Sequence, residues 1–387
     1  MRARSFPAAL AFLAAVALLA CSDPAAELDE HLAAGRAALA ERQPGEAIHA
    51  FKSALQIDPN SIDAHFGLAQ AYLAGRQARQ ALWEFDETVR LDPDHHASRI
   101  QLARLLRFGT SEDREAAVAH AQHVIDAQSL GEDDPKRWVA WVAKGRALEP
   151  LGREDEARAA YEKAAELAPD EGTPAFVLGR LLQRQGDRAG AEAQYRRLIE
   201  REPGFDSTLV LAGFLGRERS RDDEAEALYR EAVAQAAPHE QVQGIQALAG
   251  FLYARGRLDE AVQVLEEGLA EREDDPDLVA ALAGLYHASG DLDQAEATLA
   301  GAVERAAEND VQPALRLADF RYARGDVEGA LAAVEAALAS SPTHSEARLR
   351  KAELLIQTGR TSGDAARVAQ GRAIVDAALA EDEGSPE

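Results

Sequence analysis

The same small set of residues recurs about every 34 positions along the chain. In one copy, Gly35, Ala47, Phe51, Ala54 and Pro59 follow one another. The same spacings return in two later copies, formed by Gly145, Ala157, Tyr161, Ala164 and Pro169 and by Gly179, Ala191, Tyr195 and Pro203. A fixed period of this length predicts a stack of helical hairpins, because each repeat packs only on its neighbours and no single central core forms.

Each repeat is predicted to contain two helices joined by a turn. In the first copy we expect a helix around residues 32–39, a turn at 43–45 and a second helix over about 46–56. Pro59 ends that helix, because proline cannot continue one. Small residues such as Gly35 and Ala47 let the two helices approach closely. Large residues are expected to fill the wedge toward the next repeat, and these are Phe51, Phe85, Tyr161, Tyr195 and Tyr229.

These residues resemble the tetratricopeptide repeat family, in which small residues, aromatics and a proline hold fixed positions in a unit of about 34 residues. The resemblance covers roughly nine-tenths of the chain and implies an all-α fold, a right-handed α-solenoid of about ten helical hairpins with a concave inner face. The repeats are expected to start near Leu28, Ile62, His96, Trp138, Gly172, Asp206, Val242, Pro276, Val311 and Ser345.

The third repeat departs from the pattern, because it spans 42 residues from His96 to Trp138. Its small residue falls at Ala116 or Ala117, and the polar segment 131–135 follows. We expect this segment to divide the solenoid into two arms. The first arm would hold repeats one to three and the second arm repeats four to ten, over residues 28–137 and 138–380.

The last repeats also differ from the first ones. From the seventh repeat onward the wedge position carries smaller residues, which predicts looser packing there, and these are Leu265, Leu299 and Val334. The tenth repeat has an irregular turn at 358–364, and a helix near 365–380 is expected to cap the array. The acidic tail 381–387 is predicted to be disordered.

The amino terminus has the pattern of a secretory signal. Arg2 and Arg4 precede the apolar run 6–20, which is too short to span a bilayer comfortably. The run ends in Leu-Leu-Ala before Cys21, the only cysteine of the chain. This arrangement resembles a bacterial lipobox, which implies a signal peptide at 1–20 and an acylated Cys21.

A lipid anchor at Cys21 would hold the protein on a membrane of the bacterial cell envelope, followed by a short linker at 21–27. Ser22 after the cysteine implies the outer membrane, facing the periplasm, by the enterobacterial sorting pattern. The alternative is an ordinary cleaved signal or an uncleaved anchor, with Cys21 incidental.

The chain is strongly acidic, with a formal net charge of −25, yet 47% of its residues are hydrophobic. This composition favours a folded protein over a disordered one. The acidity argues against nucleic acid as a partner and against a polybasic grip on a membrane. Solvated helix faces also explain many of these charges without any partner.

A candidate binding groove follows from the family resemblance, which implies that certain first-helix positions line the concave face. The residues at these positions in the first six repeats are mostly basic, and they are Arg36, Gln70, Arg104, Arg107, Arg146, Arg180, Arg184 and Arg217. Arginine forms paired hydrogen bonds with carboxylates, so the groove suits an acidic peptide or an anionic polysaccharide. The alternative is that these arginines pair with glutamates on adjacent helices.

In the second half the corresponding inner positions are mostly aromatic, and they are Phe214, Tyr253, His287 and Tyr322. They suit contact with a peptide or a sugar, or equally packing against a neighbouring helix. The lysine and asparagine of the family's chaperone-binding clamp are not present, because this chain has Leu32 and Arg36 there.

No catalytic motif is recognisable, so we expect neither enzyme activity nor a cofactor. His120 and His123 lie three residues apart near Asp126, but two histidines without a third strong ligand are usually surface residues, and no metal is expected. The favoured function is a non-catalytic lipoprotein scaffold that binds protein partners. Residues 27–105 resemble the start of lipoproteins that accompany PEP-CTERM and exosortase systems. The alternative is therefore an accessory role in exopolysaccharide export or surface-protein sorting. A further alternative is an enzyme with its active site at the third repeat.

Overall fold

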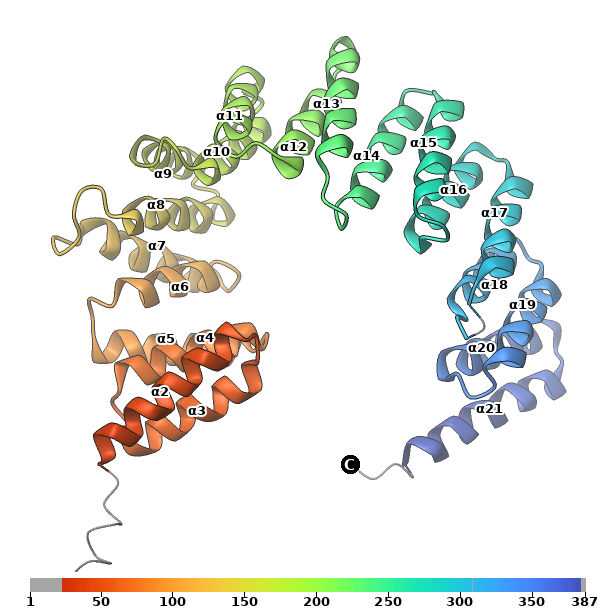
Figure 1. The fold of residues 1–387 in the computed structure, drawn as a ribbon, viewed down its shortest axis with the longest axis horizontal. Helices are drawn as coiled ribbons and strands as arrows, with labels where there is room; N and C mark the ends of the chain where they lie inside the picture. Colours follow the sequence, from red (N-terminus) through yellow and green to blue (C-terminus); the bar gives the residue numbers. More distant parts are fainter. Residues whose placement is uncertain (1–22, 308, 384–387) are drawn as a thin grey trace, which may run out of the picture. The chain divides into compact units, whose positions relative to one another are not determined.

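The computed structural model describes residues 23–307 and 309–383, and this part of the chain is all α-helical, with 20 α-helices and no strand (Figure 1). The predicted signal peptide 1–20, Cys21 and residues 384–387 of the predicted tail lie outside the described residues. None of the helices in the described part has both the length and the apolar character needed to cross a bilayer.

The helices pair into ten hairpins, which fall into two compact units divided between Glu202 and Pro203. The amino-terminal unit contains α2 (Pro24–Ala40), α3 (Pro44–Ile57), α4 (Ile62–Ala74), α5 (Ala78–Leu91), α6 (His96–Leu106), α7 (Ser111–Asp126), α8 (Pro135–Leu148), the 3-10 turn η1 (Glu149–Leu151), α9 (Glu154–Leu167), α10 (Gly172–Gln185) and α11 (Arg188–Arg201). The carboxy-terminal unit contains α12 (Phe205–Leu215), the 3-10 turn η2 (Arg219–Arg221), α13 (Asp222–Gln235), α14 (Gln241–Ala254), α15 (Leu258–Glu271), α16 (Pro276–Ser289), α17 (Leu292–Arg305), α18 (Gln312–Ala323), α19 (Val327–Ser340), α20 (Ser345–Ser362) and α21 (Ala365–Glu383).

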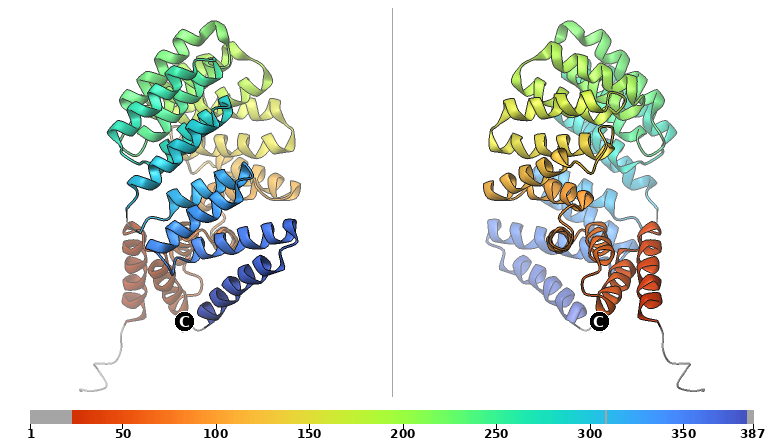
Figure 2. Two further views of the ribbon diagram at one scale, coloured as in Figure 1. Left: turned by 90° about the vertical axis from the view of Figure 1, so that its right-hand side faces the viewer. Right: turned by 90° about the vertical axis from the view of Figure 1, so that its left-hand side faces the viewer.

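The predicted α-solenoid is confirmed, because within each unit consecutive hairpins lie side by side in chain order (Figure 1 and Figure 2). Half of the first helices begin at the predicted residue, for example α4 at Ile62 and α16 at Pro276. The first turn is shorter than predicted. It ends at Gln43, and Pro44 is the first residue of α3, where its missing N–H and fixed φ cost nothing.

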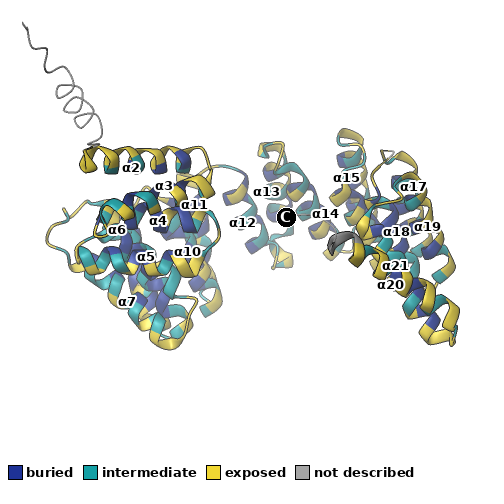
Figure 3. Cartoon of the chain, turned by 90° about the horizontal axis from the view of Figure 1, so that it is seen from below, coloured by how far each residue is buried: buried dark blue, intermediate teal, exposed yellow. Residues whose placement is uncertain are grey.

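The wedge between hairpins is filled as the sequence predicts. The ring of Phe51 is buried between Gly35 of its own hairpin and Gly67 of the next, and a methyl group at either glycine would overlap the ring. This contact explains why the position opposite an aromatic is glycine. Figure 3 shows the buried residues concentrated where neighbouring helices face each other.

The wedge residues of later hairpins follow the same rule, with one partial exception. Tyr229 is only half-buried, although its ring lies 5.0 Å, centroid to centroid, from that of Phe251 in the next hairpin. The other wedge residues are buried, and they are Phe85, Tyr161, Tyr195, Leu265, Leu299 and Val334. The small residue of the third hairpin is Ala117, which is fully buried, and not Ala116.

The polar segment 131–135 is not where the chain divides. The Arg137 guanidinium donates hydrogen bonds to the carbonyl oxygens of Ile125, Ala127, Leu130 and Gly131, which ties the loop to the start of α8. Helix α8 packs on both α7 and α6. The loop therefore lengthens the third repeat without separating it from the fourth, and the expected division into 28–137 and 138–380 is replaced by the boundary after Glu202.

The tenth hairpin is more regular than predicted. Helix α20 runs through Ser362, so most of the expected irregular turn 358–364 is helical. The turn itself is short, and Gly363 adopts a left-handed conformation (φ 75°) that glycine tolerates best. Helix α21 continues to Glu383 and so takes in the first three residues of the predicted tail.

Candidate anion-binding pocket

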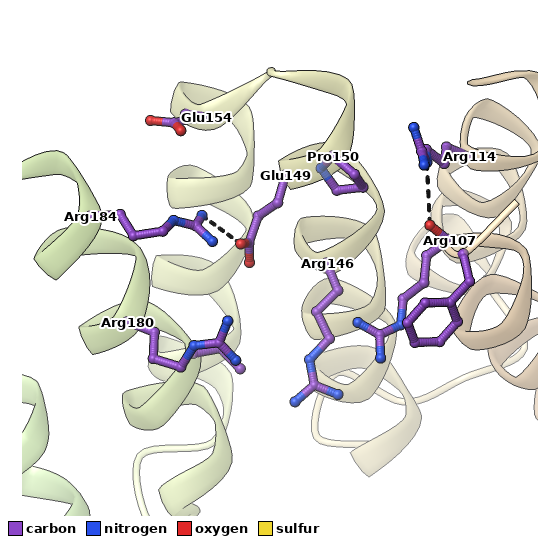
Figure 4. Close-up of a pocket in the computed structure, with 10 residues that line it drawn as sticks. Arg107, Arg114, Arg146, Glu149, Pro150, Glu154, Arg180 and Arg184 are labelled. Carbon is purple, nitrogen blue, oxygen red and sulfur yellow. Dashed lines mark hydrogen bonds and ion pairs between the residues drawn. The ribbon is translucent and has the colours of Figure 1, made fainter. Parts of the chain in front are cut away.

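A pocket of about 570 Å³ opens on the amino-terminal unit between the third, fourth and fifth hairpins (Figure 4). We call it the arginine pocket, because five of its ten lining residues are arginines against two glutamates. The lining residues are Arg107, Phe108, Arg114, Arg146, Glu149, Pro150, Glu154, Val177, Arg180 and Arg184.

The repeat itself brings these arginines together. Arg146 and Arg180 lie 34 positions apart and hold the same place on the successive first helices α8 and α10. Arg184 lies one turn beyond Arg180 on α10, so both side chains leave the same face of that helix. Arg107 directly follows α6 and extends toward the opening beside Arg146 (Figure 4).

One arginine of the pocket is neutralised by a glutamate. The Arg184 guanidinium lies 2.5 Å from the Oε2 atom of Glu149, and the Tyr161 hydroxyl donates a hydrogen bond to the other oxygen of the same carboxylate. Tyr161 is fully buried, and burial, together with this hydrogen bond, raises the pKa of its hydroxyl. The hydroxyl therefore stays a donor at neutral pH.

The other four arginines have no carboxylate within ion-pair distance in the described part of the chain, and they are Arg107, Arg114, Arg146 and Arg180. Arg107 lies over the Phe108 ring (4.1 Å to the centroid), and Arg180 lies over the Phe176 ring (5.8 Å). Burial lowers the pKa of Arg107, and the nearby charge of Arg146 lowers it further. Like charges therefore crowd a partly desolvated pocket, which favours an anion there.

Arginines outside the pocket are more often paired. Arg257 contacts both Glu226 and Glu260, and Arg153 contacts both Glu115 and Glu156. Arg36, one of the predicted groove residues, lies 2.6 Å from the Asp63 carboxylate on the next hairpin. Arg36 is therefore paired with an aspartate and does not line the arginine pocket, whereas four of the predicted groove arginines do: Arg107, Arg146, Arg180 and Arg184.

The remaining predicted groove residues lie elsewhere. Gln70 and Arg104 are exposed but do not line the arginine pocket, and Arg217 is exposed in the carboxy-terminal unit. Sequence reasoning missed Phe108, Arg114 and Glu149. Phe108 was recognisable as an aromatic in the polar turn after Arg107, whereas nothing in the repeat pattern marks the other two.

The aromatic positions of the carboxy-terminal unit do not behave alike. Phe214 is 4% exposed, so it belongs to the core and is not a groove residue, which corrects the prediction. Tyr253 is half-buried, and His287 is exposed with its ring edge-on to Phe320. The half-buried Tyr322 donates a hydrogen bond to the Gln357 side chain at 2.6 Å, so it contacts the next hairpin.

The histidines near the third hairpin make ordinary polar contacts. His123 lies 3.0 Å from an Asp94 carboxylate oxygen, and His120 accepts a hydrogen bond from Arg99 at 3.2 Å. Within the residues that the structure describes, no group of three His, Cys, Asp or Glu side chains is placed to hold a metal ion.

Paired helices stacked in two solenoid units, with a charged surface pocket, define a helical-repeat scaffold protein. The family is the tetratricopeptide repeat family, and the chain belongs to it, because family models described as tetratricopeptide repeats match most of its length. The matched residues are 38–105, 139–171, 176–240, 252–317 and 321–387. Proteins of this family bind protein or peptide partners.

Several solved structures match part of the chain at low sequence identity. PilF of Pseudomonas aeruginosa is 18% identical, over 58% of this chain and 99% of that chain, with a TM-score of 0.46. A tetratricopeptide repeat protein from Parabacteroides merdae is 14% identical, over 64% and 94%, with a TM-score of 0.44. YrrB, described as a protein with an unusual peptide-binding site, is 17% identical, over 47% and 93%, with a TM-score of 0.38. No curated protein matches the sequence.

Proposed function

We propose that this chain is a non-catalytic docking scaffold of the bacterial cell envelope, and that its arginine pocket holds an acidic segment of a partner protein. One observation carries the proposal. Four arginines share a pocket without a carboxylate partner in the described part of the chain, although the protein has a formal net charge of −25. In so acidic a protein, cations left unpaired in one place mark a site for an external anion.

The lining favours a peptide over an anionic polysaccharide. Phe108 is 71% exposed at the pocket, and Pro150, another lining residue, is exposed as well. An exposed aromatic ring next to arginines offers apolar contact area for a side chain adjacent to the carboxylate. An accessory role in polysaccharide export remains the competing function, and the binding test below distinguishes the two.

A charge reversal tests the pocket. We expect Arg146→Glu combined with Arg180→Glu to weaken binding of a labelled oligoglutamate peptide about a hundredfold, because two charge-assisted contacts become repulsive. The measurement is fluorescence anisotropy at low salt, with a polyuronate as the polysaccharide probe.

The matched control is Arg79→Glu combined with Arg219→Glu. It changes the net charge equally at two exposed arginines outside the arginine pocket. Equal losses in the two double variants would rule out the pocket as the binding site. Binding of the polyuronate but not of the peptide would replace protein docking with the polysaccharide function.

The envelope location depends on Cys21, which lies outside the described residues. We propose that it is acylated and anchors the scaffold in the outer membrane, facing the periplasm. Labelled palmitate is expected to attach to the wild-type protein and not to Cys21→Ser, as read by gel autoradiography of envelope fractions. Equal labelling of the two would contradict the anchor and leave the binding proposal untouched.

A further inference from the structure

We infer that Glu149 competes with an external anion for the arginine pocket. In the free protein its carboxylate is paired with Arg184, which limits the affinity of the pocket for that anion. The inference rests on the proposed function, because it concerns the same pocket. It adds a residue of this chain that tunes the strength of binding.

The position of Glu149 supports this role. It is the first residue of η1, directly after α8, so its side chain leaves the hairpin turn toward α10. There it meets Arg184 across the pocket, as Figure 4 shows. The Glu149 side chain is only 18% exposed, whereas that of Arg184 is 45% exposed. The Arg184 guanidinium is thus accessible to an incoming carboxylate, although it is already paired with Glu149.

The next hairpin shows that a charge is not needed at this position for the fold. Tyr195 occupies the place of Tyr161 one repeat later, and its hydroxyl donates a hydrogen bond of 2.8 Å to the Oε1 atom of Gln183. Gln183 is 34 positions after Glu149. A neutral amide therefore accepts the same hydrogen bond at the equivalent position, so the negative charge of Glu149 serves something other than the tyrosine.

The negative charge of Glu149 forms an ion pair with Arg184. An external carboxylate that approaches Arg184 must displace Glu149 or share the guanidinium with it, and either costs part of the binding free energy. Replacing the carboxylate with an amide frees Arg184 and removes one negative charge from the lining, while the hydrogen bond from Tyr161 is kept.

The test is Glu149→Gln, with Glu154→Gln as its matched control. Both variants remove one negative charge from the lining. Glu154, however, receives only a long hydrogen bond of 3.5 Å from Gln185 and pairs with none of the pocket's arginines in the described part of the chain. We expect Glu149→Gln to bind the labelled oligoglutamate peptide about tenfold more tightly than wild type, because a paired arginine becomes available. For Glu154→Gln we expect a change of about twofold at most, since an exposed charge is screened.

The outcomes separate this inference from the proposed function. If the wild type binds the peptide but Glu149→Gln binds it no more tightly than Glu154→Gln does, the internal competition is overturned. The docking function would then remain. Weaker binding by a folded Glu149→Gln would overturn it too, since Glu149 would then support the site. If neither the wild type nor any variant binds the peptide, both the docking function and the competition are refuted. Chemical denaturation of each variant establishes that it is folded.

Discussion

A deeply buried pair of titratable side chains lies away from the pocket. His65 on α4 and Glu84 on α5 are each 7% exposed, and His65 Nδ1 lies 2.6 Å from a Glu84 carboxylate oxygen. The second ring nitrogen donates to the Pro59 carbonyl oxygen at 3.1 Å. Both ring nitrogens thus face acceptors, so the imidazolium is the better-bonded form. The hydrogen bond to Glu84 raises the pKa of His65, and the Pro59 carbonyl and the nearby Glu87 raise it as well, against a lowering by burial.

This pair makes the stability of the protein depend on pH. Because the folded-state pKa of His65 is raised, its stabilisation is complete below the unfolded-state pKa of about 6.5 and is lost as the pH rises through the folded-state value. We expect the contribution of His65 to the free energy of unfolding to fall as the pH rises above about 6.5. His65→Gln should be less stable at the acidic end by about 2 kcal/mol and should lack that part of the slope. Urea denaturation at several pH values measures both, and parallel pH profiles would contradict the assignment.

Single residues also show where sequence reasoning about the site succeeds and where it stops. The repeat register alone places Arg146 and Arg180 on the same face of successive helices, so their proximity was predictable. It cannot tell a free arginine from a paired one, because pairing depends on side chains that the register does not fix. Arg36 meets Asp63 and Arg184 meets Glu149, yet both looked like groove residues. Phe214 was misassigned for a similar reason, since its ring turns into the core.

At the scale of helices, the period and the positions of proline and glycine were enough to predict almost every hairpin. The predicted ten pairs are present, and in three of them a glycine opposite Phe51, Tyr161 or Tyr195 lets two helices approach closely. The failures occur where polar residues suggested a break. The segment 131–135 looked like a linker, but one side chain, Arg137, binds three carbonyl groups of the loop and one at the end of α7. The residues before Gly363 looked like a turn, but α20 continues through Ser362, and the hydroxyls of Thr361 and Ser362 donate hydrogen bonds to a carbonyl oxygen one turn earlier.

At the scale of the whole molecule, each helix packs mainly on the helices directly before and after it. Stability in such an array is close to a sum of hairpin and neighbour terms, unlike that of a domain with one core. A core substitution is therefore expected to act locally. Two equivalent wedge positions, one in each compact unit, offer a matched comparison: Phe85 on α5 and Leu265 on α15, both fully buried.

We expect Phe85→Ala to cost about 3 kcal/mol, and Leu265→Ala a similar amount, because each leaves a cavity in a wedge. Hydrogen exchange followed by mass spectrometry should show amides of α4 to α7 exchanging about a hundredfold faster in Phe85→Ala, with α14 to α17 unchanged. Leu265→Ala should give the reverse pattern. Faster exchange spread evenly over both units in either variant would mean that the described chain unfolds as one cooperative body. Nearest-neighbour packing would then not be what limits its stability.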